Sequence, residues 1–174
     1  MPIELSIRWI VTLNCLGWPM IQMGLAWLFT RIPAEWLNAP ADVAGEAWLY
    51  RHVLHVRVWK DRLPDAAGWF TGGFAKRSLA STEPQYLRVF IRETWRGELC
   101  HYCAFLFIPL FFLWNPWWAR LVIIGYVILA NAPCIIAQRY NRIRFRRLMR
   151  LADSRMQDPP ADRERRTARR RDSR

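Results

Sequence analysis

The chain has 174 residues, of which 53% are hydrophobic and 11 are Trp, and 26 Lys and Arg against 14 Asp and Glu give it a net charge of +12. This length is typical of a single domain, and all four cysteines lie in apolar stretches, which excludes the disulfide framework of a small secreted protein. The apolar residues gather in three blocks. With the excess of arginine, these blocks indicate a membrane protein with a basic tail.

The first apolar block covers about residues 9–29 and predicts a transmembrane helix. At about 1.5 Å per residue, a helix of this length crosses a hydrocarbon core of about 30 Å. A cleaved secretory signal is the alternative, because the sequence at 39–41 resembles a cleavage site. The block is too long for a signal and polar residues separate it from that site, so the transmembrane interpretation is favoured.

The segment between residues 31 and 97 is polar and basic, and we predict that it lies at the cytoplasmic membrane interface. Two patterns in the chain are compatible with a metal or redox site: His52 with His55, and Cys100 with Cys103. The histidines are equally compatible with an interfacial helix face without function. The cysteines have no second pair and suit small buried hydrophobic residues. We therefore predict neither a metal nor a cofactor.

Two further apolar blocks, at about 98–114 and 117–138, predict a helical hairpin. Asn115 and Pro116 between them, followed by two Trp, are typical of a tight turn at the level of the lipid headgroups. A soluble hairpin is disfavoured because the last block is apolar on all sides. The predicted fold is an all-α membrane protein with about three transmembrane helices, forming one domain over residues 1–151.

The C-terminal region sets the predicted orientation. From Arg139 to the end, 14 Arg stand against five Asp or Glu. The positive-inside tendency places this end in the cytoplasm and predicts a multi-pass protein of the cell membrane. Residues 152–174 are predicted to be a disordered basic tail. Its arginines are better explained by anionic membrane lipids than by nucleic acid, which we do not predict as a partner.

Polar residues enter the second and third blocks on matching faces. Glu98 and His101 are three residues apart, and Asn131 and Gln138 are seven residues apart. Folding the hairpin about Pro116 places His101 at the depth of Asn131. Ionisable groups at a membrane are typical of a functional site, although hydrogen bonds that only hold the helices together are the alternative.

Three motifs resemble the glycosyl-4,4'-diaponeurosporenoate acyltransferase family over about residues 10–150. They are VRVWKDRLPDAAG at 56–68, RGELCHY at 96–102 and NAPCIIAQRYNRIRFRRL at 131–148. Tyr102 and Ile143 depart from the family's pattern. That family includes the enzyme of staphylococcal carotenoid synthesis that esterifies a sugar hydroxyl of a glycosylated carotenoid acid with a fatty acyl chain. The resemblance implies an acyltransferase whose acceptor is such a carotenoid or another glycolipid.

Acyl transfer to a hydroxyl needs a base, and a histidine with an orienting carboxylate is a common pair for this task. We predict that His101 is the base in a direct attack, that Glu98 orients it, and that Asn131 supplies a donor to the oxyanion. Asp61 or Asp65 could replace Glu98. Gln138 could replace Asn131.

Further residues of the three motifs are predicted to bind substrate. The acyl donor would be acyl-CoA or an acyl carrier protein, both anionic, which suits a basic surface, although ordinary headgroup contact explains the same charges. A non-catalytic membrane scaffold or lipid-binding subunit is the alternative function. The predicted binding residues are Arg57, Trp59, Lys60, Asp61, Arg96, Gln138, Arg139, Tyr140, Asn141 and Arg142.

Overall fold

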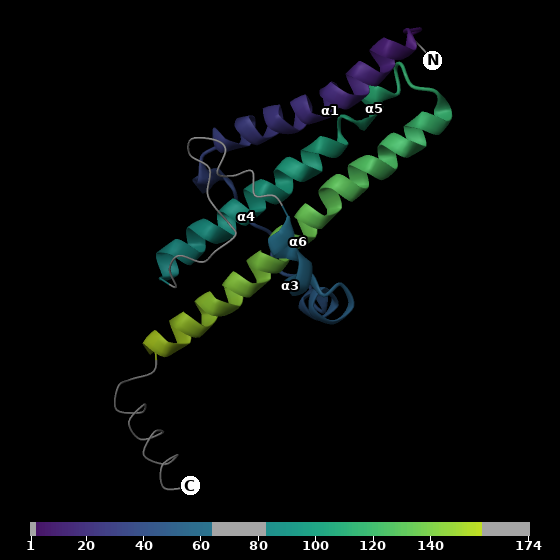
Figure 1. Cartoon of the computed structure of the whole chain (residues 1–174). Helices are drawn as coiled ribbons and strands as arrows, with labels where there is room; N and C mark the ends of the chain where they lie inside the picture. The colour runs from purple at the N-terminus through teal and green to yellow at the C-terminus, as the bar shows by residue number, and fades with distance from the viewer. Residues whose placement is uncertain (1–2, 64–82, 158–174) are drawn as a thin grey trace, which may run out of the picture.

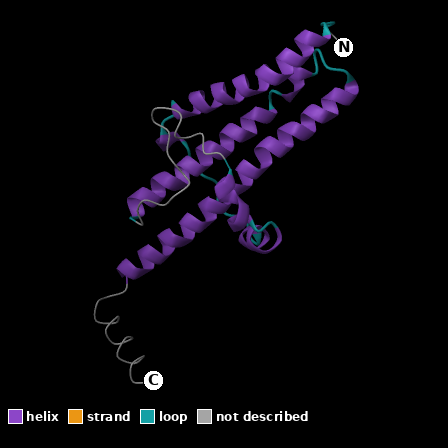
Figure 2. Ribbon diagram, in the orientation of Figure 1, coloured by secondary structure: helices purple, strands orange, loops and turns teal. Residues whose placement is uncertain are grey.

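Three long helices lie side by side in the structure, a computed structural model that describes residues 3–63 and 83–157 (Figure 1). They are α1 (Ile7–Thr30), α4 (Pro84–Phe105) and α6 (Trp117–Gln157). The described residues form only helices, turns and loops, which confirms the all-α prediction for this part of the chain (Figure 2). The shorter elements are η1 (Ala34–Trp36), α2 (Glu46–Trp48), η2 (Leu49–Val53), α3 (Val56–Trp59), η3 (Lys60–Arg62) and α5 (Ile108–Phe111).

Helix α6 is long and apolar enough to cross a membrane. Only 22% of its most apolar stretch is buried inside the protein, whereas the core helix of a soluble protein is mostly buried. Helix α1 covers the predicted first span and reaches about 36 Å at helical rise. Among the described residues, however, only the helix that begins at Trp117 is both long and apolar enough to cross a membrane. The count of three spans therefore stays a prediction.

The predicted second span is not one continuous helix. Helix α4 ends at Phe105, a turn follows, and the short helix α5 begins at Ile108. Pro109 explains the break, because its ring lacks an N–H and clashes with the carbonyl four residues earlier, that of Phe105. At the other end, α4 begins at Pro84, so the last part of the predicted interfacial segment belongs to this long helix.

Two apolar clusters hold the long helices together. The first joins α1, α4, α5 and α6 along the length of α1, and the second joins the beginning of α4 to the later part of α6. In the second cluster the rings of Phe90 and Phe145 lie 4.2 Å apart. The α4–α6 pair therefore continues beyond the end of α1 as a two-helix arm (Figure 1). Because α6 runs to Gln157, the first residues of the predicted tail are helical, and 158–174 lie outside the described residues.

A pair of asparagines ties α1 to the hairpin turn. Asn14 and Asn115 exchange two amide hydrogen bonds of 2.9 Å, and Trp114 Nε1 donates to Asn14 Oδ1 at 3.0 Å. Asn115 also donates to the carbonyl of Phe111, four residues earlier. The predicted turn at Asn115-Pro116 is present, and the asparagine side chain is the buried link that fixes it against α1.

Replacing Asn14 with Leu should destabilise the bundle. The change removes the acceptor of Trp114 Nε1 and one partner of Asn115, and a buried donor without an acceptor costs about 1–3 kcal/mol. We expect a lower thermal unfolding midpoint in detergent, whereas Thr12→Leu on the exposed face of α1 should leave the midpoint nearly unchanged. A double variant that also carries Asn115→Leu should lose less than the sum of the single variants. Simple additivity would argue against the pair.

Candidate active site

His101 and Asn131 meet between α4 and α6. His101 Nδ1 lies 2.8 Å from Asn131 Oδ1, which confirms the predicted register of the hairpin at this level. Asn131 is fully buried, and His101 is partly buried. Gln22 of α1 completes the group, because its Nε2 donates to the same Asn131 oxygen at 2.8 Å. Three helices therefore contribute one side chain each.

The hydrogen bonds of Asn131 set the state of the imidazole. Its amide nitrogen donates to the Val127 carbonyl at 2.9 Å, so its oxygen is the atom that faces Gln22 and His101. An oxygen accepts, and therefore Nδ1 of His101 must carry a proton. In a neutral imidazole the lone pair then sits on Nε2, which is the arrangement that a general base requires.

Gln22 was missed by the sequence analysis, although a signal exists. Asn14 and Gln22 are two amides in an otherwise apolar block, and eight residues separate them, so they lie on nearly the same side of α1. Each binds an asparagine of the hairpin, Asn115 and Asn131 respectively. Amides inside a predicted membrane helix indicate contacts with a neighbouring helix.

Glu98 lies one turn from His101 along α4, and two arginines of α6 hold it. Arg142 Nη1 forms a short ion pair with Glu98 Oε2, and Arg139 Nη1 lies 3.7 Å from Oε1. The Glu98 and Arg142 side chains are only 1% and 2% exposed, so this charge pair is almost completely removed from water. The guanidinium of Arg142 also lies over the ring of Trp95 at 5.4 Å.

The direction of helical side chains explains why Glu98 meets residues so far along α6. A side chain on a helix points back toward the helix N-terminus, and the N-terminus of α6 is at the hairpin turn. The side chains of Arg139 and Arg142 therefore extend toward the turn, and they contact the Glu98 carboxylate, which lies closer to the turn than their own backbone atoms. Folding the hairpin about Pro116 predicts Glu98 at the level of Cys134, because this register takes no account of the length of the arginine side chains.

Arg139 connects this ion pair to the segment before α3. Its Nε lies 2.7 Å from Glu46 Oε1, and the hydroxyl of Tyr50 donates to the same Glu46 oxygen at 2.6 Å. Burial, then the hydrogen bond to Glu46, raise the pKa of Tyr50 well above its ordinary value, so the phenol stays protonated and remains a donor. Neither Glu46 nor Tyr50 lies in the three sequence motifs.

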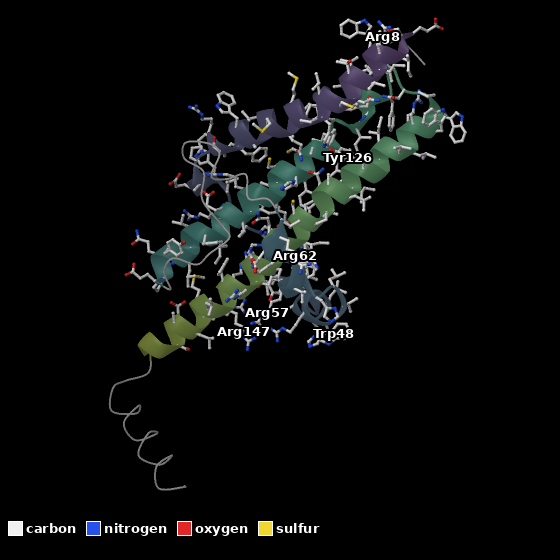
Figure 3. The ribbon with its side chains drawn as sticks, viewed as in Figure 1. Arg8, Trp48, Arg57, Arg62, Tyr126 and Arg147 are labelled. Atoms are coloured by element: carbon white, nitrogen blue, oxygen red, sulfur yellow. The ribbon has the colours of Figure 1, made fainter. Side chains whose placement is uncertain are left out.

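The predicted binding residues differ in their burial and in their contacts. Arg96 and Arg142 are buried and engaged internally, Arg96 with Glu93 at 2.8 Å and with the Ile32 carbonyl. Arg57 is exposed, as is its neighbour Arg62, and both project from the α3–η3 segment beside α6 (Figure 3). The Trp59 indole donates to the Leu54 carbonyl, and Lys60 pairs with Asp61. Of the other predicted residues, Gln138 and Tyr140 are half-buried and Asn141 is buried.

The described residues hold no group of three His, Cys, Asp or Glu side chains that could bind a metal ion. Cys100 and Cys103 pack against the first apolar cluster, in agreement with a role as small hydrophobic residues. Of the predicted alternatives, Asp61 is exposed and paired with Lys60, and Asp65 lies outside the described residues.

The fold and the site define a helical, membrane-associated protein with a hydrogen-bonded histidine among its polar contacts. Residues 25–151 match the family described as glycosyl-4,4'-diaponeurosporenoate acyltransferase, and the chain belongs to this family. It is therefore an acyltransferase, and this membership decides against the non-catalytic scaffold.

Curated relatives carry the same description. Glycosyl-4,4'-diaponeurosporenoate acyltransferases of Staphylococcus aureus strains USA300 and MRSA252 are each 29% identical to this chain over 140 residues, which is 77% of this chain and 84% of theirs. No solved structure is similar.

Glu98→Gln should destabilise the protein strongly, because it leaves Arg142 as a buried charge without an anionic partner. Breaking a buried ion pair from one side costs about 3–5 kcal/mol. We expect a large fall in the thermal midpoint of purified protein and reduced yield from membranes. A Glu98→Gln/Arg142→Gln variant removes both charges and should recover part of the loss. If the single variant were as stable as the parent protein, the ion pair would not be a structural element.

Proposed function

We propose that this chain is an integral-membrane enzyme that transfers a fatty acyl group from an acyl thioester to a sugar hydroxyl of a glycosylated carotenoid or another glycolipid. The observation that carries the proposal is the 2.8 Å contact between His101 Nδ1 and Asn131 Oδ1, which leaves the imidazole lone pair on Nε2. The acceptor class is supported by the names of the relatives.

The reaction we propose is a direct transfer with His101 as the general base. Nε2 takes the proton of the sugar hydroxyl as its oxygen attacks the thioester carbonyl. The tetrahedral intermediate collapses and expels the thiolate, which takes the proton from the imidazolium. The ester forms, the thioester breaks and the histidine returns to its neutral state, so the step needs no covalent acyl-enzyme.

In this proposal Asn131 positions the base. Glu98 instead fixes how α4 is aligned along α6, through its ion pairs with the two arginines of α6. Asn131 is the residue whose contact with the imidazole is defined, while the Glu98 carboxylate is held by Arg142 and Arg139. The oxyanion donor, predicted at Asn131 or Gln138, stays a prediction. The buried Oε1 of Gln138 has no hydrogen-bond partner within the described residues.

We further propose a multi-pass topology with the C-terminus in the cytoplasm. Exposed Trp9, Trp117 and Trp118 lie near the hairpin turn, and exposed Trp27 lies near the other end of α1. The 18 residues from Trp9 to Trp27 correspond to about 27 Å, close to the thickness of the hydrocarbon core. Arg57, Arg62 and Arg147 lie toward the end opposite Arg8, which supports this orientation (Figure 3).

The donor we propose is acyl-CoA or an acyl carrier protein, reached from the cytoplasmic side. The exposed Arg57 and Arg62 are suited to attract either anionic donor. The buried Arg96 and Arg142 are engaged by Glu93 and Glu98, which makes them structural in this proposal.

His101→Gln should abolish acyl transfer while leaving the protein in the membrane. A positioned general base contributes about 10²–10⁴-fold, so activity should fall by at least about a hundredfold. The measurement is mass spectrometry of lipid extracts from cells that make a glycosylated carotenoid, with the parent protein, the variant or no protein. A new acylated product should appear only with the parent protein.

His55→Gln is the matched control, because this histidine is exposed and its side chain contacts the nearby Val53 carbonyl in the described part of the chain. It should support normal product formation. Full activity of the His101 variant would remove His101 from the mechanism. If the parent protein gives no acylated product although it is folded and the acceptor is present, the proposed acceptor class is wrong.

Gln22→Leu should slow the reaction without weakening donor binding. Without the Gln22 donor, Asn131 keeps its bond to the Val127 carbonyl but loses one of the two hydrogen bonds to its oxygen, so the amide holds the imidazole of His101 less precisely. The loss of one such hydrogen bond corresponds to about tenfold in rate. We expect kcat to fall with KM for the donor unchanged, while Met23→Leu on the exposed face of α1 has no effect. An unchanged kcat would show that Gln22 does not position Asn131.

A further inference from the structure

A small pocket lies on the two-helix arm, away from His101. It measures about 170 Å³ and lies where the loop after η1 crosses between α4 and α6. The apolar part of its wall is Leu37, Ile91 and Met149, and the basic part is Arg88, Arg92 and Arg146. None of these three arginines belongs to the predicted substrate-binding set. A pocket that combines an apolar wall with three guanidinium groups favours an amphiphilic anion.

The charges of this pocket are only partly neutralised by the protein. Arg146 pairs with Asp42 at 2.5 Å and donates to the Ala39 carbonyl at 2.9 Å, so the protein holds it in place. Arg88 and Arg92 make no ion pair within the described part of the chain. They are four residues apart on α4, where like charges repel each other and destabilise a helix. A bound anion would relieve this repulsion.

The depth of the pocket suits a phosphate group. Arg92 precedes His101 by nine residues, which corresponds to about 14 Å along α4. The pocket therefore lies beyond the apolar part of the bundle, on the side where Arg139 and Arg142 mark the end of the apolar part of α6. Headgroup phosphates of a bilayer lie beyond its apolar core, and a soluble thioester donor would bring its phosphates to the same side from the water.

We propose that Arg88, Arg92 and Arg146 form a phosphate-binding site for a phosphorylated amphiphile, either the acyl donor or an anionic phospholipid. Arg88 and Arg92 bind the phosphate oxygens, and Arg146, held by Asp42 and Ala39, keeps the loop after η1 closed over the pocket. The apolar residues contact the carbon atoms next to the phosphate. The site extends the proposed function, because it gives the donor or a lipid a defined position relative to His101.

The test measures binding and needs no catalysis, so it is independent of the acyl-transfer assay. Full-length protein in neutral phosphatidylcholine nanodiscs is titrated with coenzyme A, which carries the phosphates of one donor class without an acyl chain. Binding of phosphatidylglycerol is measured separately, by its retention on protein purified from mixed vesicles. Arg88→Gln/Arg92→Gln is compared with Arg147→Gln/Arg150→Gln, which removes two exposed arginines of the same arm that do not line the pocket.

We expect the pocket variant to bind one of the two probes at least about tenfold more weakly, because losing a single charge-assisted hydrogen bond lowers affinity by about tenfold or more. The control variant should change binding by less than about twofold. Loss of coenzyme A binding alone identifies the donor as the source of the phosphate, and loss of phosphatidylglycerol alone identifies the lipid. Equal losses in both variants, or no loss in the pocket variant, would overturn the site. Either result would leave the role of His101 untouched.

Discussion

The ion pair between Glu98 and Arg142 is the constraint on which the rest of the structure depends. Both side chains are almost completely buried. Separating them would leave a buried charge without its partner, which is energetically costly. The pair therefore fixes the register of α4 against α6. That register places His101 against Asn131, and the second arginine on Glu98, Arg139, joins the helices to the segment before α3 through Glu46.

The position of this ion pair along the helices explains how a membrane protein tolerates it. The apolar part of α6 begins at Trp117, and Asn131 lies about 21 Å farther along the helix. Arg142 has its backbone about 17 Å beyond Asn131, outside the apolar stretch, and only its long side chain reaches back to Glu98. The charge is therefore paired beyond the apolar stretch of α6, and the neutral amides Gln22 and Asn131 lie alongside that stretch.

Two levels of amide contacts attach α1 to the hairpin. Near the turn, Asn14 binds Asn115 and Trp114, and near the site, Gln22 binds Asn131. Between these levels the contact between α1 and the other helices is apolar, with Trp18 packed on Phe111 at 5.7 Å. Hydrogen bonds between membrane helices are individually weak, commonly about 0.6 kcal/mol, so their main effect here is on orientation. They set the rotation of α1 and therefore the direction of the Gln22 amide.

Sequence patterns predicted the helical fold, the hairpin turn and the contact of His101 with Asn131, because helix periodicity and the position of Pro116 determine all three. They did not predict the partners of Glu98, because those depend on the length and direction of the Arg139 and Arg142 side chains. They did not identify Glu46, because the contacts between separate segments do not follow from local periodicity. For Gln22 the two amides of α1 indicate a contact with a neighbouring helix, but not which residue is its partner. For the same reason the sequence did not predict the proposed phosphate pocket, whose arginines come from two helices that pack together through the cluster of Phe90 and Phe145. The arginines of this protein therefore have two roles. Those that packing buries, such as Arg142, hold the helices together, and those that stay exposed, such as Arg88, are available to a ligand.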